Sequence, residues 1–164
     1  MQMEQKDSQY DFINLTKDGE RVRAMITQLI EDKLIWRCLQ PSRDIAKVPY
    51  FLGEAILKFR HIYNSYSAFM SAGGLSEERA FVFKADVFEA TFDILRMDGV
   101  VKIDNEQDRI RFIFALAGEL SQIENEEAKS TCSALVGLLL RLGQEYKTWK
   151  EIEKKVPDFS NQES

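Results

Sequence analysis

The chain has 164 residues and a formal net charge of -5, with 45% hydrophobic and 30% charged residues. This length allows one domain with a buried core that needs no disulfide or metal. The acidic balance argues against electrostatic capture of nucleic acid or anionic membranes, and no apolar run approaches the roughly 20 residues of a membrane span.

The expected compartment is the cytoplasm. The two cysteines, Cys38 and Cys132, lie far apart and form no CxxC motif, as is typical of reduced thiols inside the cell. Residues 1–9 are polar and lack the apolar region of a secretory signal peptide, so we expect a disordered tail there.

The first half of the domain, expected to span 10–156, begins with a helix near Gly19 that ends near Asp32. Residues 34–39 form a short apolar run that ends at Gln40-Pro41, and this pattern favours a strand.

A long helix is predicted over 49–71, because Pro49 suits the first helical turn. One apolar stripe is expected on it: Phe51, Leu52, Ala55, Ile56, Phe59, Ile62, Tyr63, Tyr66, Phe69 and Met70. Gly73-Gly74 is predicted to stop this helix, and Ser76 to cap a further helix over 77–97.

Residues 100–103 are the other strand-like run, and they could pair with 34–39 as a two-stranded ribbon. A helix over 106–123 follows, capped by Asp104 or Asn105. A last helix over 127–153 extends to about Lys155, and residues 157–164 are expected to be a disordered tail. The expected fold is therefore a mainly α, single-domain bundle of about five helices.

The residues that could carry out chemistry are few. His61 is the only histidine of the chain, so multi-histidine metal sites are impossible, and neither cysteine has zinc-site spacing. The chain has no phosphate-binding glycine loop and no nucleophile-elbow motif. We therefore expect a protein that is not an enzyme and that uses no metal and no cofactor.

The charges fall in blocks that suit recognition of a partner. Residues 33–61 carry six basic and two acidic side chains, whereas residues 104–127 carry seven acidic and two basic ones. The two blocks could complement each other within the fold or across a homodimer, or the basic block could meet an acidic partner.

These patterns predict a protein–protein interaction module: an adaptor, a chaperone-like protein or a small subunit of a larger cytoplasmic assembly. A partner segment is expected to dock on an aromatic-rich helical groove. The candidate contact residues are Phe51, Lys58, Phe59, Arg60, Tyr63, Tyr66 and Phe69. The alternative is a nucleic-acid-binding accessory protein that uses the basic 33–61 segment. At its end, over 58–66, basic side chains interleave with Phe59, Tyr63 and Tyr66.

Overall fold

Five α-helices make up most of the part of the chain that the computed structural model describes, residues 2–66 and 83–155. They are α1 (Gln2–Glu31), α2 (Lys47–Tyr66), α4 (Ala85–Ile94), α5 (Glu106–Gln122) and α6 (Glu126–Lys155). Three short 3-10 helices join them: η1 (Arg37–Leu39), η2 (Asp44–Ala46) and η3 (Met97–Gly99). The prediction of a mainly α bundle is confirmed. The predicted turn at Gly73-Gly74, the cap Ser76 and the tail 157–164 lie outside the described residues.

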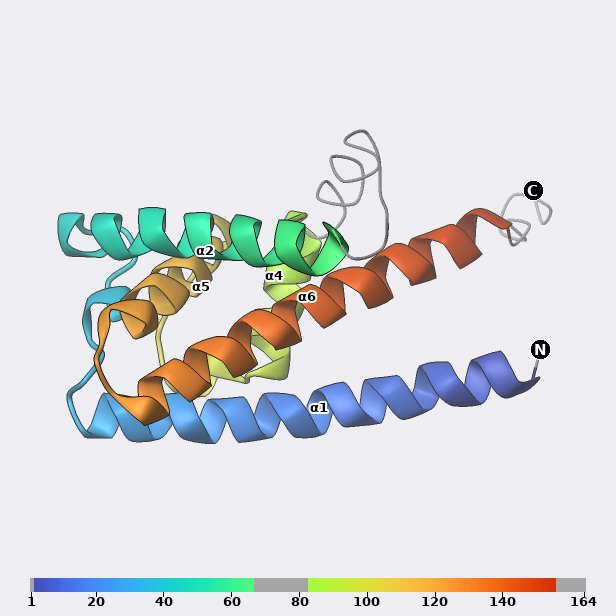
Figure 1. Ribbon diagram of the computed structural model, residues 1–164, viewed down its shortest axis with the longest axis horizontal. Coiled ribbons are helices and arrows are strands. Elements are labelled where there is room, and N and C mark those ends of the chain that lie inside the picture. The colour runs from blue at the N-terminus through green and yellow to red at the C-terminus, as the bar shows by residue number, and fades with distance from the viewer. Residues whose placement is uncertain (1, 67–82, 156–164) are drawn as a thin grey trace.

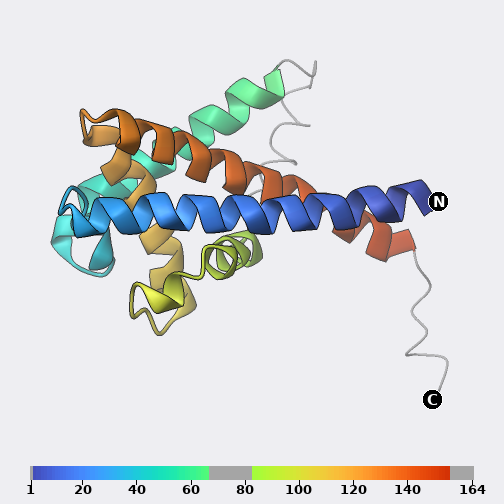
Figure 2. The ribbon, with the colours of Figure 1, turned by 90° about the horizontal axis from the view of Figure 1, so that it is seen from below.

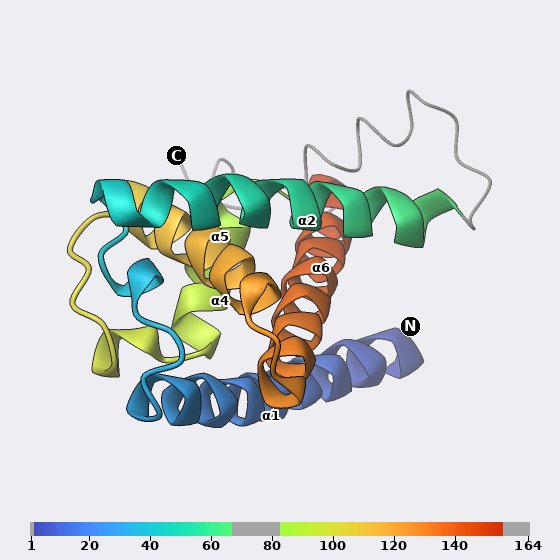
Figure 3. The same cartoon turned by 60° about the vertical axis from the view of Figure 1, so that its left-hand side comes forward.

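Helix α5 forms the centre of the bundle. Nine consecutive residues, from Phe112 to Leu120, are buried in it. A helix that is buried on all sides must be covered by neighbours. Helix α2 packs along one side of α5, while α1 lies on the far side of the molecule from α2, against α6 and α4 (Figure 1 and Figure 3).

The two longest helices, α1 and α6, each have 30 residues and run past the rest of the bundle at one end (Figure 2). Arg141 of α6 donates a hydrogen bond of 2.6 Å to Asp18 of α1. Residues 2–9, where the sequence predicts a disordered tail, belong to α1. No Pro or Gly interrupts residues 2–18, so the helix continues to Gln2.

Helices α2 and α5 cross with their backbones in direct contact. A Cβ atom built on Gly53 of α2 would overlap the carbonyl oxygen of Phe114. One built on Gly118 of α5 would overlap the carbonyl oxygen of Pro49. Because only a hydrogen atom stands at each position, the two helices approach more closely than interleaved side chains allow.

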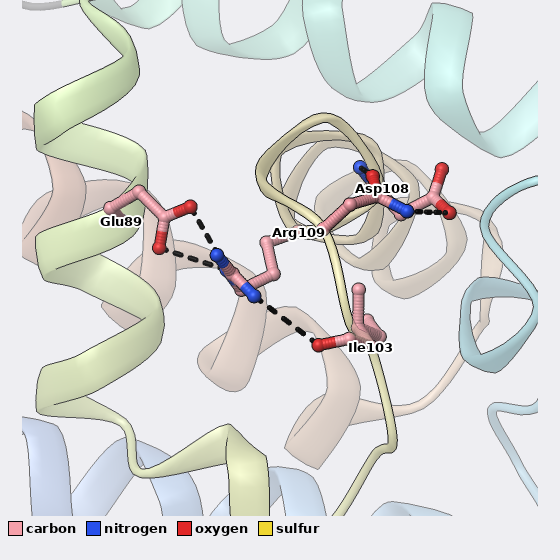
Figure 4. Close-up of polar contacts among 5 residues, drawn as sticks. Glu89, Ile103, Asp108 and Arg109 are labelled. Atoms are coloured by element: carbon pink, nitrogen blue, oxygen red, sulfur yellow. Dashed lines mark hydrogen bonds and ion pairs between the residues drawn. The ribbon is translucent and has the colours of Figure 1, made fainter.

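Helix α4 is tied to α5 by a paired carboxylate and guanidinium. Arg109 Nε lies 2.9 Å from both carboxylate oxygens of Glu89, and its Nη1 donates to the carbonyl oxygen of Ile103 at 3.3 Å (Figure 4). Both side chains of the pair are about one-quarter exposed, so the contact is partly shielded from solvent. This arrangement holds the segment that precedes α5 against α4.

The possible β-ribbon between 34–39 and 100–103 is not formed, since neither segment is a strand in the structure. Ile35 and Cys38 are buried three residues apart, with Trp36 exposed between them, and Arg37–Leu39 is the 3-10 helix η1. The backbone N–H groups of Trp36, Arg37 and Cys38 donate to the carboxylate of Glu119 instead of a second strand. The buried carboxylate of Glu119 therefore takes the place of the strand-to-strand hydrogen bonds that the apolar run predicts.

Candidate functional site

Helix α2 has one buried side and, opposite to it, an exposed apolar side. Toward α5 it buries residues that are spaced four apart: Pro49, Gly53, Leu57 and His61. The opposite side points away from the bundle, and we call it the exposed α2 face. Its residues are Val48, Phe51, Leu52, Ala55, Phe59, Ile62 and Tyr63. Positions 48, 52, 55, 59 and 62 of this face alternate in steps of four and three, which is the spacing of a seam that packs on a second helix.

The exposed α2 face is large for a single chain. Phe51 and Phe59 are each 66% exposed and Tyr63 is 68% exposed. The face offers on the order of 600 Å² of apolar surface, at the upper end of the largest patch on a typical monomer. The rings of Phe59 and Tyr63 stack with their centroids 6.2 Å apart, so the two side chains form one continuous aromatic patch.

The structure separates the seven predicted contact residues. Phe51, Phe59 and Tyr63 lie on the exposed α2 face. The side chain of Tyr66 and all of Phe69 lie outside the described part of the chain.

The two basic residues of the set lie apart from each other. Lys58 is held by Glu54 of the same helix, with Nζ and Oε1 2.7 Å apart. Arg60 lies around the helix from Lys58, because two residues turn an α-helix by about 200°.

The apolar stripe that the sequence predicts on α2 faces away from the bundle. Leu52, Phe59 and Ile62, which that stripe includes, are exposed. Val48 also belongs to the exposed α2 face, although it was not among the predicted contacts. The alternating four-three spacing predicts a helix face that packs on a neighbour, but it does not say whether that neighbour belongs to the same chain.

A groove of about 260 Å³ runs beside the exposed α2 face, between α2, the end of α5 and α6. We call it the α2–α6 groove, and its lining residues are Ile56, Arg60, Ser121, Lys129, Cys132, Ser133 and Val136. Two cations therefore stand at its edge, one from each of the facing helices. Burial raises the pKa of the Cys132 thiol, and the nearby charge of Arg60 lowers it by a smaller amount.

The buried carboxylate of Glu119 has a structural role. Glu119 is 2% exposed, and its carboxylate accepts three backbone N–H groups. Oε2 accepts from Trp36 and Arg37, each at 3.0 Å, and Oε1 accepts from Cys38 at 2.9 Å. The negative charge is thus satisfied at the start of η1 and attaches that turn to α5.

The buried thiol of Cys38 predicts a loss of stability at alkaline pH. Burial raises the pKa of Cys38 well above its ordinary value, and the charge of Glu119 raises it further. The thiol's contribution to stability is fully present below its unfolded-state pKa of about 8.5 and is lost as pH rises toward the folded-state pKa.

We expect the free energy of unfolding to fall between pH 8 and 10 by about 1–2 kcal/mol more in the wild type than in Cys38→Ala. Urea titrations at the two pH values measure this difference. An equal fall in both chains would contradict it.

The remaining reactive side chains of the described residues form no cluster that could hold a metal ion. His61 is 2% exposed, with its ring tilted against Phe83 at a centroid distance of 5.7 Å. Among the described residues, no three His, Cys, Asp or Glu side chains are grouped so that they could hold a metal ion.

Protein-family models, curated proteins and solved structures were all compared with the chain. None of them matches it. No helix in the described ranges is both long and apolar enough to cross a membrane.

Two of the six cations in the basic 33–61 segment are paired with acidic side chains of the same segment. Lys47 pairs with Asp44 at 2.8 Å and Lys58 pairs with Glu54, while Arg60 borders the α2–α6 groove. Nucleic-acid binding through this segment stays a prediction, and no contact in the described part of the chain favours it.

Proposed function

We propose that this protein is a non-enzymatic protein–protein interaction module, which docks an apolar segment of a partner on the exposed α2 face. Such a module serves as an adaptor, a chaperone-like protein or a small subunit of a larger assembly. The observation that carries the proposal is the exposure of Phe51, Phe59 and Tyr63 on one side of a helix whose other side is buried. Exposed apolar patches of this size mark binding surfaces.

The position of α2 makes this surface ready to bind. The crossing at Gly53 and Gly118 fixes α2 on α5, so the helix needs no ordering when a partner arrives. The stacked rings of Phe59 and Tyr63 are large contact groups with few rotatable bonds, which is the character of residues that dominate binding energy.

The cytoplasm is the compartment we propose for this function. Cys38 and Cys132 are both free thiols, which persist in a reducing compartment.

A photo-crosslinking experiment tests the proposal in the organism that makes the protein. The crosslinking amino acid p-benzoylphenylalanine is placed at position 59, and the matched control carries it at Glu20, an exposed residue of α1. We expect one protein to be crosslinked at position 59 and not at position 20. Equal capture at both positions, or no protein crosslinked at position 59, would reject the proposal.

Removing two aromatic side chains from the same surface tests how much they contribute to the binding energy. Phe59→Ala with Tyr63→Ala is expected to weaken binding of the crosslinked partner at least 100-fold, as loss of central aromatic contacts does. Both side chains are about two-thirds exposed, so the free energy of unfolding should change by about 0.5 kcal/mol or less. Calorimetric titration and urea unfolding measure the two effects separately.

A further inference from the structure

The backbone of α2 limits the kind of segment that can dock on it. An α-helix satisfies its own N–H and C=O groups, so α2 offers no free ladder to a partner strand. Its exposed face instead presents ridges of side chains in alternating steps of four and three, from Val48 to Ile62. Such ridges pack into the grooves of a second helix.

Charge distinguishes among the helices that could lie there. The whole chain is acidic, with a formal net charge of -5, yet the charged side chains that line the α2–α6 groove are Arg60 and Lys129. Their partner is expected to carry carboxylates, because like charges at an interface cost several kcal/mol while opposite charges set orientation.

Helix α2 of a second copy of this chain meets that requirement poorly. Helix α2 contains three basic residues, Lys47, Lys58 and Arg60, and one acidic residue, Glu54. Packing two such helices together would bring like charges to the interface.

We propose that the occupant of the exposed α2 face is an acidic amphipathic helix of another protein. Its apolar stripe covers Leu52, Phe59 and Tyr63, and its carboxylates reach Arg60 and Lys129 at the edge of the α2–α6 groove. This inference rests on the proposed function and names the chemistry of the partner.

Three synthetic helical peptides test the inference with the full-length protein. They share one leucine stripe and differ only at the flanking positions, which are all Glu, all Gln or all Lys. Fluorescence anisotropy at low salt should show the Glu peptide binding at least 10-fold more tightly than the Gln peptide, and the Lys peptide binding most weakly. The preference should shrink as salt is added, because exposed charges are screened.

Charge reversal tests whether the groove is responsible. The double variant Arg60→Glu, Lys129→Glu should reverse the order of the three peptides. The control Lys17→Glu, Lys102→Glu makes the same change of net charge at exposed positions outside the groove, and it should keep the wild-type order. Phe59→Ala should weaken the binding of all three peptides by a similar factor of at least 10-fold.

Several outcomes would contradict the proposal of an acidic helix. These are absence of binding by the Glu peptide, an order unchanged by Arg60→Glu, Lys129→Glu, or an order also reversed by the control. Self-association that is lost in Phe59→Ala, measured by sedimentation equilibrium, would instead identify a second copy as the occupant. The crosslink at position 59 is read independently. If it captures another protein while the peptides fail, the interaction function stands and the acidic helix is rejected.

Discussion

Replacing Gly53 with alanine is expected to lower the free energy of unfolding by about 3 kcal/mol or more. The added methyl group would overlap the carbonyl oxygen of Phe114, which belongs to the backbone of the central helix and cannot rotate away. Helices α2 and α5 would have to separate to admit it, and the contacts around the crossing would be lost. Gly118→Ala should act similarly, because its methyl group meets the carbonyl oxygen of Pro49.

Gly137 supplies the matched control for this prediction. It also lies inside a helix, but nothing stands within 4 Å of a Cβ atom built on it. Gly137→Ala should therefore stabilise the protein by about 0.5–1 kcal/mol through helix propensity alone. Urea unfolding measures all three variants. A Gly53→Ala variant within 0.5 kcal/mol of wild type would show that the backbones are not in contact.

The crossing also links stability to the candidate site. Gly53 lies on the buried side of α2, while Phe59 lies on the exposed face. A methyl group at position 53 shifts the helix that carries the exposed face without changing any residue on it. Weaker partner binding in this variant would then come from a displaced helix.

Helix periods and caps were the features that the sequence could predict. The expected helix over 106–123 differs from α5 by one residue, since one apolar face and a local cap mark it in the sequence. Of the two predicted caps, Asn105 is the one that acts, because its side-chain oxygen accepts from the N–H of Asp108 at 2.8 Å. Such signals depend on residues that are near in sequence.

The candidate site was harder to predict, because the apolar stripe of α2 is the side that the bundle leaves exposed. Periodicity predicts a helix with an apolar face but does not say whether the rest of the bundle will cover that face. That choice depends on Gly53 and Gly118, which are 65 residues apart in the chain and meet only in the folded state. Aromatic density predicts contacts at Phe51, Phe59 and Tyr63, whereas Leu52 and Ile62 are predicted only as members of the same apolar stripe.

The run 34–39 illustrates a second limit. Its apolar composition favours a strand, and nothing within the run indicates where its N–H groups find acceptors. The acceptor is Glu119, about 80 residues away, which by itself resembles any solvent-facing glutamate on a helix. A long-range polar contact therefore decides the local structure.

The second large effect is expected for Glu119→Gln, which should lower the free energy of unfolding by about 2–3 kcal/mol. An amide keeps one acceptor oxygen but turns an N–H₂ group toward at least one of the N–H groups of Trp36, Arg37 and Cys38. Two donors then face each other inside the core, and the charge-assisted strength of the remaining bonds is lost. Glu119→Ala should cost about 3–5 kcal/mol, because all three N–H groups lose their acceptor.

Hydrogen exchange locates the effect, which urea unfolding alone cannot do. If the carboxylate holds η1 against α5, the amides of Trp36, Arg37 and Cys38 should exchange faster in Glu119→Gln than the global loss of stability accounts for. The control Glu124→Gln changes an exposed carboxylate in the loop between α5 and α6. It should leave the free energy of unfolding and the exchange of these amides unchanged within error. Protection of the three amides that falls only in step with global stability would mean that η1 is held by burial of Ile35 and Cys38. Faster exchange confined to these amides would mean that one buried charge determines the path of the chain between α1 and α2.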